Sequence, residues 1–137
     1  MNMENPLEAL GRAAVAASRE MAALSPQEKT AALLLMAAGV RGAAERIIRE
    51  NSLDMEEAGK NGRNAAFLDR LLLTPERVEH MARGMEQVAA LPDPVGECIR
   101  EWTRPNGLHI RQVRVPLGAI GFIYESRGSV TLSLIHI

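Results

Sequence analysis

The chain has 137 residues, of which 24% are charged and 47% apolar, as in a single globular domain rather than a disordered chain. Its formal charge of −1 gives none of the basic excess that marks nucleic-acid or anionic-membrane binding, so neither partner is expected. Cys98 is the only cysteine, which excludes an internal disulfide and a four-cysteine zinc site. No apolar run approaches the roughly 20 residues that span a bilayer, and the start of the chain lacks a signal-peptide pattern, so a cytoplasmic location is expected.

The first two thirds of the sequence have helical periodicity. Apolar residues between 7 and 24 recur at steps of three and four, which places them on one helical face. A second helix is predicted to begin at the sequence Ser25-Pro26-Gln-Glu28, where serine can cap, proline suits the first turn and glutamate completes a capping box. Its apolar stripe continues to Ile48, and the two glycines Gly39 and Gly42 predict a break or kink on the way.

Two more helices are predicted before residue 97. A short polar helix is expected over residues 55–60, closed by Gly62. Thr74 and Pro75 then start a helix that ends before the prolines at 92 and 94. Its buried stripe is predicted to be Val78, Met81, Met85, Val88 and Ala89, and its outer face Glu79, Arg83 and Glu86.

The sequence becomes strand-like after Gly96. Residues 97–103 and 108–115 read as two strands, and the pair Asn106-Gly107 between them predicts a hairpin with a type I′ turn. Residues 118–124 are apolar at every position, as in a strand buried on both faces of a parallel sheet. Such a sheet requires further βα units to cover it.

Few side chains indicate chemistry on their own. Cys98 is expected to be a packing residue of a strand rather than a nucleophile, because no histidine lies near it in sequence. The three histidines have no metal-binding spacing, and the acidic group around Asp54 is expected to be a solvated helix face. Gly118 and Gly121 lie inside a strand, so they do not form a dinucleotide-binding fingerprint. The loop 125–129 follows the carboxyl end of the predicted strand, where Arg127 could meet a phosphate or carboxylate; a plain turn is the alternative.

Four stretches resemble the γ-glutamyl phosphate reductase family (glutamate-5-semialdehyde dehydrogenases). These are residues 69–76 (DRLLLTPE), 91–96 (LPDPVG), 105–108 (PNGL) and 113–127 (VRVPLGAIGFIYESR). The order and spacing agree from about residue 5 to residue 131. Residues 116–127 are the most specific part, because the sequence Tyr-Glu-Ser-Arg is rare at this place in other aldehyde dehydrogenases.

The resemblance implies an α/β fold like that of aldehyde dehydrogenases, here truncated to N-terminal helices, a β-hairpin arm and the first strand of the nucleotide-binding sheet. It implies NADPH-dependent reduction of L-glutamate 5-phosphate to L-glutamate 5-semialdehyde and phosphate, in L-proline biosynthesis. In that chemistry a cysteine thiolate displaces phosphate. The family's nucleophilic cysteine lies beyond the last residue of this chain and Cys98 does not match it, so the chain is expected to be inactive alone.

The resemblance also assigns parts of the chain. Residues 1–96 would be the helical part of the nucleotide-binding domain, 97–115 the hairpin arm of a homo-oligomer, and 116–131 the start of the sheet. Tyr124, Glu125, Ser126 and Arg127 match the loop that faces cofactor and substrate. The sequence departs from the family at Gly128, where Pro-Asn usually follows the arginine.

The last six residues, 132–137 (LSLIHI), do not resemble the family's continuation. They match the in-frame translation of a common transposon-derived sequencing adapter, CTG-TCT-CTT-ATA-CAC-ATC, so we interpret them as a non-native tail. Two alternatives to a stand-alone reductase stay open. One is a non-catalytic helical and hairpin association module; the other is a fragment of a bifunctional pyrroline-5-carboxylate synthase, in which the reductase follows a glutamate kinase.

Overall fold

The computed structural model describes residues 6–124 and residue 130. Within this part the chain forms five helices and one two-stranded sheet. The helices are α1 (Pro6–Ala22), α2 (Pro26–Gly42), α3 (Ala44–Lys60), α4 (Ala65–Leu71) and α5 (Pro75–Ala89), and the strands are β1 (Cys98–Thr103) and β2 (His109–Val113). The chain divides into two compact units, residues 1–26 with 92–121 and residues 27–91 with 122–137, which are described separately. No helix in the described ranges combines the length and apolar character needed to cross a bilayer.

The helical unit contains α2 to α5, and its helix boundaries differ in part from the prediction. The break expected near Gly39 and Gly42 is confirmed, since α2 ends at Gly42 and α3 begins at Ala44. The short polar helix predicted over 55–60 is only the end of α3, which runs unbroken from Ala44. α4 was not predicted at all; Asn64 caps it, its side-chain oxygen accepting from the Phe67 N–H at 2.9 Å.

α2 and α5 pack through a small core. Ala37 of α2 and Ala82 and Met85 of α5 are fully buried, and Val40 packs against them. The predicted stripe of α5 is confirmed at Val78, Met85 and Ala89 and corrected at Met81 and Val88, which are only partly buried. Ala82 is buried instead of these two, because its methyl group allows the helices to approach closely.

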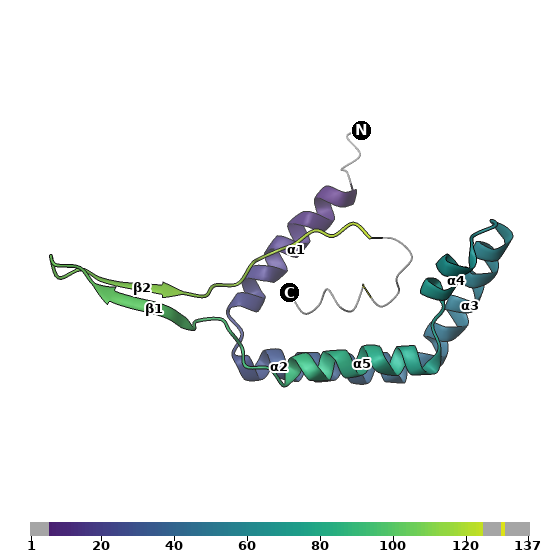
Figure 1. The fold of residues 1–137 in the computed structure, drawn as a ribbon, viewed down its shortest axis with the longest axis horizontal. Helices are drawn as coiled ribbons and strands as arrows, with labels where there is room; N and C mark the ends of the chain where they lie inside the picture. The colour runs from purple at the N-terminus through teal and green to yellow at the C-terminus, as the bar shows by residue number, and fades with distance from the viewer. Residues whose placement is uncertain (1–5, 125–129, 131–137) are drawn as a thin grey trace. The chain divides into compact units, whose positions relative to one another are not determined.

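In the other unit, no described side chain is buried, neither in α1 nor between residues 92 and 121. β1 and β2 pair antiparallel (Figure 1). Trp102 lies opposite Ile110, and Glu101 lies opposite Arg111. The register shifts between Cys98 and Arg100, which marks a bulge. The predicted hairpin is therefore confirmed, with β1 one residue and β2 three residues shorter than the strands predicted over 97–103 and 108–115.

The hairpin turn is not of the predicted type I′. The Gly107 N–H donates to the Arg104 carbonyl at 2.9 Å, so Pro105 and Asn106 are the central residues of the turn. Proline holds φ near −65°, and a type I′ turn needs positive φ at both central residues. The positive φ of +84° falls on Gly107, the residue after them. The arrangement is that of a three-residue hairpin loop with glycine at the left-handed position.

Residues 114–124 have no regular secondary structure, so the strand predicted over 118–124 is not formed. A strand exists only when a neighbour completes its hydrogen bonds, and the one sheet in the described part contains β1 and β2 alone. Gly118 also has a φ of +85°, far from extended backbone. The interpretation of residues 132–137 as a tail lies outside the described residues. The domain assignments 1–96, 97–115 and 116–131 stay predictions.

Candidate functional site

The predicted cofactor- and substrate-facing loop is described only at its first residue. Tyr124 is half-exposed and lies outside regular secondary structure. Glu125, Ser126 and Arg127 lie outside the described residues. The ligand role of this loop therefore stays a prediction.

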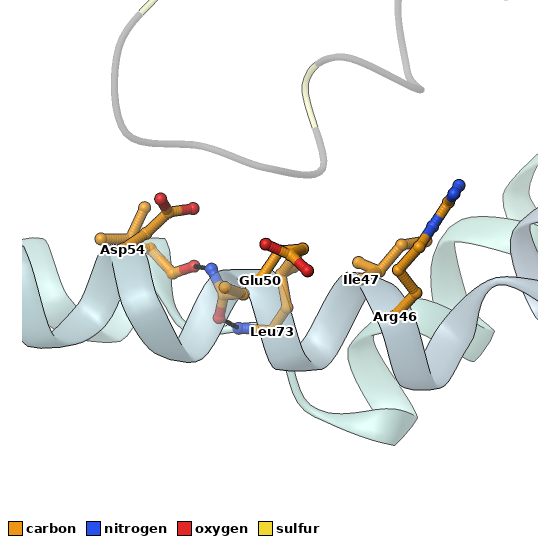
Figure 2. Close-up of a pocket in the computed structure, with 7 residues that line it drawn as sticks. Arg46, Ile47, Glu50, Asp54 and Leu73 are labelled. Atoms are coloured by element: carbon orange, nitrogen blue, oxygen red, sulfur yellow. Dashed lines mark hydrogen bonds between the residues drawn. The ribbon is translucent and has the colours of Figure 1, made fainter.

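The helical unit has a shallow hollow of about 330 Å³ between α3 and the connection from α4 to α5 (Figure 2). It is lined by Arg46, Ile47, Glu50, Asn51, Asp54, Leu71 and Leu73. Figure 2 shows the charged ends of Arg46, Glu50 and Asp54 along one side of α3, pointing away from the helix axis. The sequence had indicated only that Asp54 belongs to a solvated acidic face.

Asn51 forms the floor of this hollow and is the buried polar residue of the described chain. Its amide nitrogen donates to the Leu71 carbonyl at 2.9 Å, and its amide oxygen accepts from the Leu73 N–H at 2.7 Å. The side chain thus pairs with the backbone as a neighbouring strand would. The Leu71 carbonyl and the Leu73 N–H, at and just after the end of α4, have no partner within a helix, and Asn51 supplies a hydrogen bond to each. The role of Asn51 is structural, and the sequence analysis missed it.

Arg41 of α2 lies against two glutamates of α5. Its Nε donates to Glu79 at 2.8 Å and its Nη2 to Glu86 at 2.9 Å, so one guanidinium joins both carboxylates. Arg83 adds a further bond to Glu79 at 2.9 Å. Glu79 and Glu86 lie outside the buried stripe of α5, as predicted, but their side chains are only partly exposed because both pair with Arg41.

These contacts shift the acidity of the groups involved. Hydrogen bonds from Arg41 and then Arg83 lower the pKa of Glu79 to about 2. The bond from Arg41 lowers the pKa of Glu86, and the two carboxylates raise the pKa of Arg41. A cluster whose charges are fully paired holds the helices together and leaves no group available for acid–base work at neutral pH.

The start of α5 is capped as predicted. The Thr74 hydroxyl accepts from the Arg77 N–H at 3.2 Å, and Pro75 occupies the first turn. The pKa of Glu76 is lowered, first by a hydrogen bond from the backbone N–H of Glu76 itself and then by one from the Thr74 hydroxyl. The Arg77 guanidinium donates to the Leu72 carbonyl at 2.8 Å and to the Asp69 carboxylate at 2.8 Å, which fixes the turn from α4.

The cysteine and histidine side chains form no reactive group in the described part. Cys98 is partly buried at the bulge of β1, and its thiol donates to the Arg100 carbonyl at 3.5 Å. His109 lies 3.1 Å from the Thr103 hydroxyl and 3.7 Å from Glu101 on the opposite strand. Among residues 6–124 and 130, no three His, Cys, Asp or Glu side chains gather where a metal could bind.

A nicotinamide dinucleotide is not matched by the described residues. Phosphate groups of dinucleotides bind at a glycine-rich turn that opens a helix. The helices of the helical unit open instead at Pro26, Ala44, Ala65 and Pro75. Gly118 and Gly121 lie in irregular backbone and not in the strand where they were expected. The described part therefore supplies no phosphate cradle.

Comparison with known proteins gives one family. The chain is 51% identical over 122 residues to "Gamma-glutamyl phosphate reductase" of Rhodopseudomonas palustris, covering 89% of this chain and 28% of the relative. It is 52% identical over 122 residues to the protein of the same name from Rhodospirillum rubrum, covering 89% and 29%. No family model matches the chain.

Solved structures agree with the sequence comparison. The crystal structure of γ-glutamyl phosphate reductase from Thermotoga maritima superposes with a TM-score of 0.91 at 35% identity, covering 96% of this chain and 32% of that one. The protein of the same name from Saccharomyces cerevisiae gives a TM-score of 0.89 at 26% identity, covering 96% and 34%. The chain spans less than a third of the length of the curated relatives it matches. The predicted resemblance and fold are confirmed: over nearly all of its length the chain is homologous to the γ-glutamyl phosphate reductases and has the fold of the matching part of their structures.

Proposed function

We propose that this chain is part of a cytoplasmic enzyme that reduces L-glutamate 5-phosphate to L-glutamate 5-semialdehyde with NADPH in L-proline biosynthesis. The observation that carries the proposal is the agreement of sequence and fold with one family, 51% identity to a curated relative and a TM-score of 0.91 to a solved one. Identity at this level over 122 residues supports a shared activity for the whole protein.

The chain itself contributes scaffold rather than chemistry to this activity. The charged cluster of Arg41, Glu79 and Glu86 is used in a contact between two helices. Cys98 lies at the hairpin bulge, where its thiol donates to the Arg100 carbonyl at 3.5 Å. We therefore expect the 137-residue chain to be inactive as the sole reductase of a cell.

The hairpin is proposed to be the arm through which subunits of the whole enzyme associate. A two-stranded sheet is marginally stable in water by itself, and both edges of this one remain available for a further strand in the described part. Trp102 lies opposite Ile110 in the strand pair. The guanidinium carbon of Arg100 lies 4.5 Å from the centre of the Trp102 ring. Aromatic residues and arginines of this kind are enriched where proteins associate.

The proposal is tested by complementation of a proline auxotroph that lacks its own γ-glutamyl phosphate reductase. The 137-residue chain alone should not restore growth. A chimera in which residues 6–124 replace the matching segment of the Rhodopseudomonas palustris relative should restore growth and NADPH-dependent reductase activity. The matched control is the unmodified relative, expressed at the same level. A soluble chimera without reductase activity would contradict the proposed function, and growth with the chain alone would contradict its inactivity.

A further inference from the structure

The loop of the β-hairpin contains an asparagine followed directly by a glycine, Asn106 and Gly107, and both residues are exposed. The backbone nitrogen of a glycine can attack the side-chain carbonyl carbon of the asparagine before it, because glycine places no Cβ in the path. A Cβ placed on Gly107 would meet nothing within 4 Å, so the space around the reacting groups is open. The loop therefore contains both groups that an internal cyclisation requires.

The hydrogen bonds of the loop orient the Asn106 side chain for this attack. Its Oδ1 accepts from the Leu108 N–H at 3.2 Å, which turns the side chain back toward its own main chain. The same N–H donates to the oxygen on which negative charge develops, as a backbone donor of an oxyanion hole does. The Gly107 N–H donates to the Arg104 carbonyl at 2.9 Å, and this bond has to open before the nitrogen reacts. Local opening costs little in a unit none of whose described side chains is buried.

A second asparagine–glycine pair, Asn61 and Gly62, has a different environment. The Asn61 N–H donates to the Glu57 carbonyl and the Gly62 N–H to the Gly59 carbonyl, both at 3.0 Å, so the pair continues the hydrogen bonding of α3. Asn61 keeps a φ of −81° and a ψ of 9°. No described group donates to its side-chain oxygen. The chain thus carries an internal control with the same two residues but without the oxyanion donor.

We propose that Asn106 is a site of self-modification, at which the chain converts asparagine into aspartate and isoaspartate with water as the co-reactant. The Gly107 nitrogen loses its proton to solvent and bonds to the Asn106 Cγ. The Cγ–Nδ2 bond then breaks, and ammonia leaves with a proton taken up from solvent. Water opens the cyclic imide at Cγ to give aspartate, or at the original main-chain carbonyl to give isoaspartate. Nothing is oxidised or reduced.

Isoaspartate changes the main chain of the loop. The chain then runs through the Asn106 Cβ and Cγ, which inserts a methylene group between residues 106 and 107. The bond from the Arg104 N–H to the Leu108 carbonyl, at 2.8 Å, spans this point. Because a two-stranded sheet is marginally stable, an altered loop should weaken the pairing of β1 and β2. The modification site is independent of the proposed reductase activity; its effect on association rests on the proposal that the hairpin joins subunits.

The test is incubation of the purified 137-residue chain at neutral pH and physiological temperature, followed by peptide mass spectrometry. Deamidated peptides are recognised by their increased mass, and isoaspartate by methylation with an isoaspartyl methyltransferase. In the folded chain Asn106 should react at least about tenfold faster than Asn61. In guanidinium chloride the two rates should agree within about twofold, because both asparagines precede glycine and no fixed hydrogen bond then distinguishes them.

The matched variant is Asn106→Gln, whose longer side chain forms the corresponding ring much more slowly. Incubation should remove the hairpin chemical shifts of residues 98–113 from the unmodified chain and leave them in Asn106→Gln. Circular dichroism at 222 nm should stay unchanged in both. Equal rates at Asn106 and Asn61 in the folded chain, or a faster rate at Asn61, would overturn the proposal. The same ratio of rates before and after unfolding would also overturn it, because the preference would then not come from the hydrogen bonds of the loop.

Discussion

The helical unit and the hairpin unit, residues 1–26 with 92–121, differ in how far they bury side chains and pair backbone groups. Between α2 and α5 the chain closes a core around Met85, caps its helices and uses Asn51 to complete the backbone pairing of a connection. Between residues 92 and 121 the same chain buries no side chain. The helical unit thus meets these requirements with its own residues, although several of the pairs that do so lie far apart in the sequence.

The difference follows from how each structure meets its backbone hydrogen bonds. A helix pairs its own N–H and C=O groups within four residues, so only its ends and one face need other elements. A strand pairs nothing internally and needs a neighbour on each side to be buried. The prediction of α5 from its own start signal succeeded, and the prediction of a strand over 118–124 failed, for this reason.

The largest effect that would test this comparison is expected at Asn51. Replacing Asn51 with alanine leaves the Leu71 carbonyl and the Leu73 N–H without partners beneath the hollow. We expect a loss of about 2–3 kcal/mol in the free energy of unfolding of the helical unit. Urea titration followed by circular dichroism at 222 nm measures it.

The matched control is Ser52→Ala, in the next position of the same helix. The Ser52 hydroxyl donates only to the Ile48 carbonyl of its own helix, on the exposed side. Its loss should change the unfolding free energy by less than about 0.5 kcal/mol. Equal losses for the two variants would show that the helical unit does not depend on the Asn51 pairing.

The sequence predicted those elements whose signals are local. Thr74 and Pro75 mark the start of α5, and the structure has the cap where it is expected. The hairpin is likewise marked by its own loop, although Pro105 excludes the turn type that Asn106-Gly107 suggested. These signals lie within a few residues of the element that they specify, so no tertiary knowledge is required.

The features that the sequence did not predict depend on residues far apart. Asn51 interrupts the apolar pattern of α3, which made residues 55–60 resemble a separate helix, and its partners are 20 and 22 residues away. The pairing of Glu79 and Glu86 with Arg41 was not predicted, because Arg41 lies 38 and 45 positions before them. Nothing in a periodicity reveals such pairings. Only Asn64, a residue that commonly caps helices, offered a local signal for α4.

A smaller effect is expected from replacing glycine with alanine, which should change the stability of the two units in opposite directions. Gly107 has a φ of +84° in the hairpin turn, so Gly107→Ala should destabilise the hairpin by about 1 kcal/mol. Gly59 lies in α3 with nothing within 4 Å of an added Cβ, so Gly59→Ala should stabilise the helical unit by about 0.5–1 kcal/mol. Backbone chemical shifts of residues 98–113 and thermal unfolding at 222 nm measure the two effects. Loss of helical stability in Gly59→Ala would contradict the open space around that glycine.

The smallest effect concerns acid, and it also distinguishes the units. Glu79 has its pKa lowered from an ordinary 4.5 to about 2 by Arg41 and Arg83, and the pKa of Glu86 is lowered by Arg41. A carboxylate whose pKa is lower in the folded state stabilises that state above its ordinary pKa and loses this contribution as the pH falls through the folded value. The helical unit should therefore lose stability between about pH 5 and pH 2.

Arg41→Met should reduce this pH dependence of stability, and Arg83→Met, which removes one bond to Glu79 alone, should reduce it less. Circular dichroism at 222 nm follows the helices, whereas the fluorescence of Trp102, the only tryptophan, follows the hairpin. Arg41→Met is expected to change the pH titration followed by circular dichroism and to leave the titration followed by Trp102 fluorescence unchanged. An equal change in both titrations would mean that the cluster of Arg41, Glu79 and Glu86 also stabilises the hairpin.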